Sequence, residues 1–266
     1  MFTKNNYRNV GQTELRVSPI TLGTMTFGDQ NTQSDAFEQL DYAASKGINS
    51  FDVAEMYPVP PKANTCHRTE EIIGNWLEGK KREDFVISTK IAGPRRSIDW
   101  IRGGPKSLDR ENINEAVNDS LKRLKTDYVD LLYLHWPERN VPMFGGYKFD
   151  PKDDFLNKEK INWVSIEEQL LSIEHLIKAG KVRYFALSNE WPWGLMEFIR
   201  LAKDEVFVRS LGIPASRIEG YLYPETYNFT ANSKAQYVIE SMVNVFKTKT
   251  ADIDFSNSKY SKQREK

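Results

Sequence analysis

The stretch Ser50-Phe51-Asp52-Val53-Ala54-Glu55-Met56-Tyr57 decides how the rest of the chain is interpreted. It ends an apolar β-run that starts at Ile48, and it leaves an acid and a phenol where that run stops. Side chains at the carboxyl ends of parallel strands face the crevice in which α/β enzymes hold their active sites. Asp52 and Tyr57 are therefore candidates for proton transfer. The alternative is that Asp52 caps a turn and Tyr57 packs beside it.

The composition is that of an ordinary globular protein. The chain has 266 residues, 39% of them apolar, which is enough to bury a sizeable core. Lys plus Arg and Asp plus Glu both number 37, so no charge surplus predicts nucleic acid or a membrane surface as a partner. A single cysteine, no basic-plus-apolar leader and no long apolar run predict a cytoplasmic location. Cys66 and His67 adjoin each other, but two ligands do not make a metal site, so no metal is expected.

Strand and helix patterns alternate along the chain. Residues 7–17 predict a β-hairpin around Gly11-Gln12. Five strand-then-helix units follow, and such a series predicts a parallel sheet with right-handed crossovers. The strands are expected at 20–22, 48–52, 85–90, 128–135 and 182–187, and the helices at 34–46, 69–77, 113–124, 166–179 and 193–203. The fourth helix begins with a predicted capping box, Ser165-Ile166-Glu167-Glu168.

Polar side chains stand at the ends of successive predicted strands. Asp52, Lys90, His135 and Ser188 each occupy such an end, one strand–helix unit apart. Four residues in this register would converge above a (β/α) barrel, where barrel enzymes place their active sites. Each residue singly could also be a solvated strand end, a partly buried histidine or a helix N-cap.

Residues 7 to about 203 resemble an aldo-keto reductase, closest to the Tas-like branch of that family. The resemblance rests on blocks that occur in order: Leu22-Gly23-Thr24-Met25-Thr26-Phe27-Gly28, Asp52-Val53-Ala54-Glu55-Met56-Tyr57-Pro58-Val59-Pro60-Pro61, Ser88-Thr89-Lys90, Leu121-Lys122-Arg123-Leu124, Leu134-His135-Trp136-Pro137 and Gly180-Lys181-Val182-Arg183-Tyr184 leading to Ser188-Asn189. It implies an α/β fold of the (β/α)8 TIM-barrel type and NADPH-dependent reduction of a small-molecule aldehyde or ketone. It also implies a catalytic tetrad of Asp52, Tyr57, Lys90 and His135.

The resemblance further implies where the cofactor binds. Gly23, Thr24 and Met25 would border NADPH through their backbone, together with Asp52. Ser188 and Asn189 would hold the nicotinamide carboxamide.

The chemistry agrees with these residue types. Reduction of a carbonyl by a hydride leaves an alkoxide that needs a proton. Tyr57 would supply it as the general acid, and Lys90, paired with Asp52, would lower the pKa of the phenol. His135 would donate a hydrogen bond to the carbonyl oxygen and fix its angle. The loop 138–163 is expected to line the substrate pocket.

The pattern changes after residue 203. A complete barrel takes about 250 residues, and the remaining part of this chain does not continue the series, so an incomplete barrel is expected over residues 1–203. Residues 206–248, with Phe207-Val208-Arg209-Ser210-Leu211-Gly212-Ile213-Pro214 and Glu219-Gly220-Tyr221-Leu222-Tyr223-Pro224-Glu225, resemble a fragment of MltG-like (YceG-like) endolytic murein transglycosylases. A second segment is therefore expected over 204–248, followed by a polar, disordered tail over 249–266.

Three functions stay open at this point. The first is an NADPH-dependent carbonyl reductase. The second is a noncatalytic remnant of a reductase that acts at most as a binding module. The third is a role at the cell envelope through the transglycosylase-like segment, which the absence of that family's catalytic glutamate motif and of an export signal disfavours. The sequence does not indicate an oligomeric state.

Overall fold

The centre of the protein is a parallel sheet of five strands in the order β3-β4-β5-β6-β7. The computed structural model describes residues 2–11, 13–94, 97–104, 107–142, 144 and 163–203. Strands that follow one another in sequence are neighbours in the sheet, as in a (β/α) barrel, which confirms the predicted alternation. The strands are β3 (Thr21–Gly23), β4 (Ser50–Asp52), β5 (Val86–Ile91), β6 (Val129–Leu134) and β7 (Val182–Leu187).

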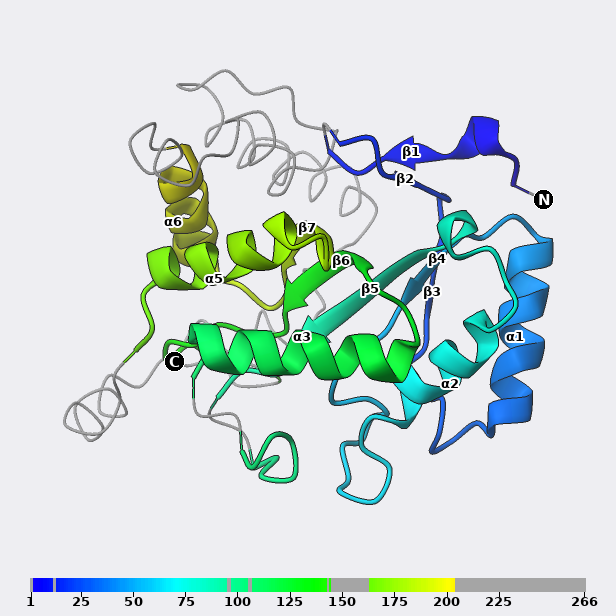
Figure 1. Ribbon diagram of the computed structural model, residues 1–266, viewed down its shortest axis with the longest axis horizontal. Coiled ribbons are helices and arrows are strands. Elements are labelled where there is room, and N and C mark those ends of the chain that lie inside the picture. The colour runs from blue at the N-terminus through cyan, green and yellow to red at the C-terminus, as the bar shows by residue number, and fades with distance from the viewer. Residues whose placement is uncertain are drawn as a thin grey trace, which may run out of the picture. The chain divides into compact units, whose positions relative to one another are not determined.

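Helices follow each of these strands and pack on one face of the sheet (Figure 1). Three of them begin with the caps that their sequences supply, since the side chains of Thr32, Asp109 and Ser165 accept the amides of Asp35, Asn112 and Glu168. Of the predicted capping box at Ser165, the structure shows this serine half. The helices are α1 (Gln33–Ser45), α2 (Arg68–Leu77), α3 (Arg110–Leu124), α5 (Ile166–Lys178) and α6 (Pro192–Lys203), with short 3₁₀ helices η1 (Lys4–Asn6) and η2 (Arg82–Asp84).

The two faces of the sheet differ because side chains along a strand alternate between them. One face is apolar and packs into the main core against the helices, through Phe51, Ile87, Leu132 and Phe185 among others. In β5, Thr89 points to this side, where its hydroxyl donates to Glu70 of α2. The next residue, Lys90, points to the other side, where it meets Asp52. The helix-free face therefore carries the polar residues of the candidate site.

The N-terminal hairpin packs against that second face near the strand starts. Strands β1 (Arg8–Asn9) and β2 (Arg16–Val17) pair antiparallel, which confirms the predicted hairpin. Leu15 of its second arm is buried in a cluster with Val86 and Leu131, which lie toward the beginnings of β5 and β6. Asp52, Lys90 and His135 lie at the opposite, carboxyl ends of the strands, which is where barrel enzymes place their active sites.

Several predictions concern residues outside the described ranges. They include the transglycosylase-like segment, the polar tail and most of the loop 138–163 that is expected to line the substrate pocket. Within the ranges given above, the structure contains no helix that is long and apolar enough to cross a membrane.

Candidate active site

Asp52 and Lys90 form the base of the candidate site. The ammonium of Lys90 donates to Asp52 Oδ2 at 2.6 Å and to the carbonyl of Val53 at 2.8 Å. Ser88, the partner of Asp52 across β4 and β5, donates its hydroxyl to Asp52 Oδ1 at 2.8 Å. Both carboxylate oxygens thus have partners from β5, so the sheet register itself fixes the Asp52–Lys90 pair.

Tyr57 and His135 lie beside this pair. The Tyr57 hydroxyl lies 3.4 Å from Lys90 Nζ, and its ring meets the His135 ring edge-on with 5.7 Å between centroids. Tyr57, Lys90 and His135 are 9%, 7% and 6% exposed, so the group is shielded from bulk water. The structure therefore brings the four residues of the predicted tetrad together, although they lie on separate parts of the chain.

The pKa of Tyr57 does not follow the sequence-based prediction. Burial, reinforced by the negative charge of Asp52, raises the pKa of the phenol to about 12. Lys90 was expected to lower that pKa, and this expectation is wrong for the chain alone. Removal from water disfavours the phenolate here, so Tyr57 holds its proton throughout the neutral range.

The pKa of Lys90 is shifted as well. Burial lowers the pKa of its ammonium, and the adjacent carboxylate of Asp52 opposes that shift. A lysine held this way keeps its hydrogen bonds to Asp52 and Val53, yet its charge is less strongly favoured than in water.

A buried ion pair that the sequence analysis missed supports the Tyr57 loop. Glu55 and Arg102 have side chains 1% and 4% exposed, and Arg102 Nε donates to Glu55 Oε1 at 2.6 Å while Nη2 donates to Oε2 at 3.1 Å. Glu55 Oε2 also accepts the amide of Ala92, just past β5. The pair thus joins the loop after β4 to the loop after β5. A glutamate within the buried run 53–57 is the sequence signal that could have revealed it.

Gly23, Thr24 and Met25 lie beside Asp52 at the end of β3. Gly23 is the sheet partner of Asp52, and a Cβ added to Gly23 would meet nothing within 4 Å. Thr24 is buried and donates its hydroxyl to the carbonyl of Asp52 at 2.8 Å, whereas the Met25 side chain is 51% exposed. The backbone at Gly23 therefore faces open space next to the tetrad, as a planar ligand would require.

Ser188 and Asn189 end β7 on the other side of His135. The Asn189 amide nitrogen donates to the His135 carbonyl at 2.7 Å and to the Ser188 hydroxyl at 3.1 Å. Among the described residues, the Ser188 proton and the Asn189 amide oxygen have no partner. One donor and one acceptor together match the hydrogen-bonding groups of a carboxamide. Ser188 and Asn189 thus present groups that could bind a primary carboxamide.

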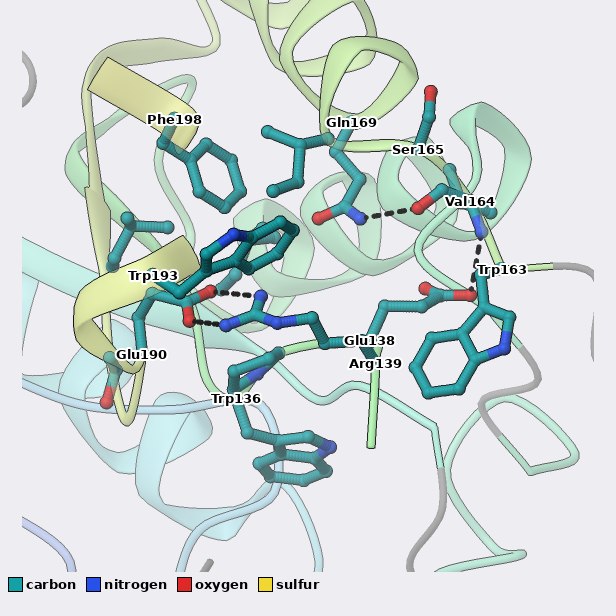
Figure 2. A pocket seen from close by; sticks show the side chains of 15 residues that line it. Trp136, Glu138, Arg139, Trp163, Val164, Ser165, Gln169, Glu190, Trp193 and Phe198 are labelled. Carbon is teal, nitrogen blue, oxygen red and sulfur yellow. Dashed lines mark hydrogen bonds and ion pairs between the residues drawn. The ribbon is translucent and has the colours of Figure 1, made fainter. Parts of the chain in front are cut away.

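A cavity of about 210 Å³, lined in part by Ser188, lies on the helix side of the sheet (Figure 2). Leu134, Trp136 and Phe198 contribute apolar walls, and Arg139 and Glu190 lie at one side of it. None of the tetrad residues lines this cavity. It is therefore separate from the face on which Asp52 and Lys90 meet.

Cys66 and His67 lie in the turn before α2. His67 Nδ1 is 2.7 Å from the carbonyl oxygen of Glu55, and burial raises the pKa of the Cys66 thiol to about 11. In the part of the chain that the structure describes, no three residues of the types His, Cys, Asp and Glu are grouped so that they could hold a metal ion.

Sequence comparison relates most of the chain to known reductases. A model of the Aldo/keto reductase family matches residues 19–211. The protein is 45% identical over 199 residues to the Escherichia coli protein "Protein tas", which covers 74% of this chain and 55% of that protein. It is 33% identical over 196 residues to the Bacillus subtilis protein "Uncharacterized oxidoreductase YrpG", which covers 72% of this chain and 51% of that protein. The chain thus spans about half the length of these curated relatives.

Structural comparison gives the same result. The crystal structure of a thermostable aldo-keto reductase in complex with the inhibitor epalrestat superimposes with a TM-score of 0.53 at 27% identity, covering 73% of this chain and 57% of the other. The predicted fold class, of the (β/α)8 TIM-barrel type, is confirmed. The resemblance of residues 206–248 to transglycosylases stays a prediction. With the tetrad geometry and a family match over residues 19–211, this chain belongs to the aldo/keto reductase family.

Proposed function

We propose that this protein is an NADPH-dependent oxidoreductase that reduces aldehydes or ketones to alcohols. The observation that carries the proposal is the contact series Asp52–Lys90–Tyr57, with distances of 2.6 and 3.4 Å, beside the buried His135. A phenol, an ammonium and an imidazole that meet in a dry crevice are the groups that protonate and orient a carbonyl oxygen.

Tyr57 acts as the general acid in this proposal. NADPH, when bound, supplies the hydride. With a pKa of about 12 the phenol is protonated at neutral pH, so it has a proton to donate to the oxygen that gains charge. Lys90 holds the Tyr57 hydroxyl in place, and Asp52 holds Lys90. His135 donates a hydrogen bond to the same substrate oxygen and so sets its position.

The cofactor would be held at its nicotinamide end by the groups that flank the tetrad. Ser188 donates to the carboxamide oxygen and Asn189 accepts from its nitrogen. Gly23, Thr24 and Met25 line the ring through their backbone, since the space beside Gly23 is open. The preference for NADPH over NADH is part of the proposal and follows from the family.

The remaining expectations are proposals of the same kind. They are a small-molecule carbonyl substrate, a cytoplasmic location and no nucleic-acid or membrane partner. A transglycosylase-like origin of residues 206–248 also stays a proposal. The competing function is a noncatalytic remnant of a reductase that acts at most as a binding module.

Two measurements test the proposed function on the full chain. Titration with NADPH, followed by cofactor fluorescence, should show saturable binding that NADH competes for weakly. Mixing the complex with a panel of aldehydes and ketones should then consume NADPH in proportion to the alcohol formed. Saturable binding followed by turnover supports the reductase, whereas a chain that does not bind NADPH supports the noncatalytic remnant, in which the cofactor site is lost.

A further inference from the structure

An ion pair between Arg139 and Glu190 links the two loops that flank the proposed carboxamide site. Arg139 lies on the loop after β6, four residues beyond His135, and Glu190 directly follows Ser188-Asn189. Arg139 Nη1 donates to Glu190 Oε2 at 2.9 Å, and Nη2 contacts Oε1. Figure 2 shows the guanidinium and the carboxylate facing each other in this two-point arrangement. Their side chains are 22% and 6% exposed, so the charges are largely withdrawn from water.

The surroundings of the pair leave it little freedom. The Trp193 ring lies 5.0 Å from the Arg139 guanidinium, at cation–π distance (Figure 2). A Cβ added at Gly194 would collide with the guanidinium of Arg139 and the carboxylate of Glu190, so the pair packs directly against this glycine. The Glu190 carboxylate also accepts the amide of Trp191 at 2.6 Å. The pair is therefore packed and bonded from several sides rather than being a solvated surface contact.

The turn next to the pair has a backbone shape that needs support. Asn189 has φ 55°, a left-handed conformation that asparagine adopts more readily than other non-glycine residues but that still limits the turn to one backbone shape. On its N-terminal side the turn is fixed by the Ser188 amide, which donates to the Leu134 carbonyl at 3.1 Å. On its C-terminal side the next residue is Glu190, whose side chain is anchored to Arg139. The ion pair thus holds one end of this turn.

We propose that Arg139 and Glu190 are positioning residues that hold Ser188 and Asn189 in the shape that binds the nicotinamide carboxamide. The inference rests on the proposed function. The hydrogen bonds described for the pair join Arg139 to Glu190 and Glu190 to the Trp191 amide, so their loss should act on cofactor binding and spare the proton transfer from Tyr57. Removing one partner leaves a poorly hydrated charge that pulls the loop toward other partners or water.

Glu190→Gln in the full chain tests the inference, because it keeps the shape of the side chain and removes its charge. NADPH should bind about tenfold more weakly, while kcat at saturating NADPH stays within about threefold of the unaltered chain. The matched control is Glu197→Gln, which breaks the exposed Arg200–Glu197 pair on α6, where the side chains are 60% and 27% exposed. This control should leave NADPH affinity within about twofold.

A double-mutant cycle tests whether Arg139 and Glu190 affect NADPH affinity through their contact with each other. Arg139→Met alone should weaken NADPH binding about as much as Glu190→Gln, and the double variant should be no weaker than either one. Arg139→Lys keeps the charge but loses the planar two-point contact, so it should recover part of the affinity. Trp193→Ala, at a side chain that is 64% exposed, provides a variant with little risk to folding and should weaken binding by a few-fold.

The outcomes separate this inference from the function on which it rests. An unaltered chain that does not bind NADPH overturns both. An unaltered chain that binds NADPH while Glu190→Gln and Trp193→Ala bind it equally tightly overturns the positioning role alone. Equal losses in kcat and affinity, or strictly additive losses in the double variant, also overturn it, because they indicate a general loss of structure rather than a linked pair.

Discussion

The two halves of the candidate site are held in different ways. In the tetrad half, Asp52 and Lys90 are neighbours across strands in register, and the ion pair of Glu55 with Arg102 braces the adjoining loop. In the carboxamide half, Asn189 is exposed, Ser188 and Asn189 are hydrogen-bonded to the carbonyls of Leu134 and His135, and the next residue, Glu190, is paired with Arg139. Asp52 and Lys90 are thus fixed by the register of the sheet, whereas the residues proposed to bind the carboxamide are fixed by loop contacts. A sheet tolerates little local adjustment, and a loop tolerates more.

The largest expected effect comes from removing the proton that Tyr57 donates. Tyr57→Phe keeps the ring and its packing against His135 but deletes the hydroxyl. Turnover should fall by roughly 10²- to 10⁴-fold, with NADPH affinity unchanged. Steady-state rates together with a fluorescence titration measure both quantities. Turnover equal to that of the unaltered chain would remove Tyr57 from the role of acid.

The next largest effect is expected on stability, at the brace of the tetrad half. Glu55→Gln leaves Arg102 charged and buried without its counter-ion, so the free energy of unfolding should drop by about 3 kcal/mol or more. The exposed Lys122–Asp119 pair provides the control, with side chains 76% and 35% exposed. Asp119→Asn should cost less than about 1 kcal/mol. Urea unfolding of both variants measures the two free energies of unfolding. Similar losses in the two variants would mean that the buried Glu55–Arg102 pair contributes no more to stability than the exposed pair.

The pH dependence of carbonyl reduction and of alcohol oxidation tests the raised pKa of Tyr57. Reduction needs the protonated phenol, which burial preserves by raising its pKa to about 12, so its rate should stay flat between about pH 7 and about pH 9. Oxidation of the alcohol needs the phenolate, whose fraction rises about tenfold per pH unit below the pKa. Oxidation rates at saturating cofactor should therefore climb through this window. A plateau near neutrality would show that the bound cofactor reverses the effect of burial.

The smallest effects are expected in the carboxamide half. Asn189→Gly accepts the left-handed backbone but loses the hydrogen bond to the His135 carbonyl, which should cost about 0.5 to 1.5 kcal/mol in stability. Asn189→Ala loses the same bond and adds backbone strain, so it should be less stable than the glycine variant by about 1 kcal/mol. Thermal unfolding of the two variants isolates the strain. Equal stability would show that the turn relaxes freely.

The sequence predicted the convergence of the tetrad because strand ends and side-chain alternation are local properties. Asp52, Lys90 and His135 could each be placed at a strand end before any coordinates, and the parallel order followed from the repeated units. The pKa of Tyr57 could not be predicted, since the effect of Lys90 is readable from residue types but the depth of burial is not.

The two bracing ion pairs were also missed, and for a common reason. Arg102 lies in a loop with a left-handed φ of 47°, and Glu190 is far from Arg139 in sequence. Contacts between loops depend on backbone paths that periodicity does not encode. Glu55 inside a buried run and a glutamate next to a left-handed turn are signals that could direct attention to such pairs in related sequences.

The opposite directions of Thr89 and Lys90 limit how this protein can vary. An insertion or deletion of one residue within β5 would bring a threonine to the crevice and force the ammonium among apolar helices beside Glu70. Changes of length are thus confined to the connections between strands, where new substrate preferences can arise while the acid and its lysine keep their places.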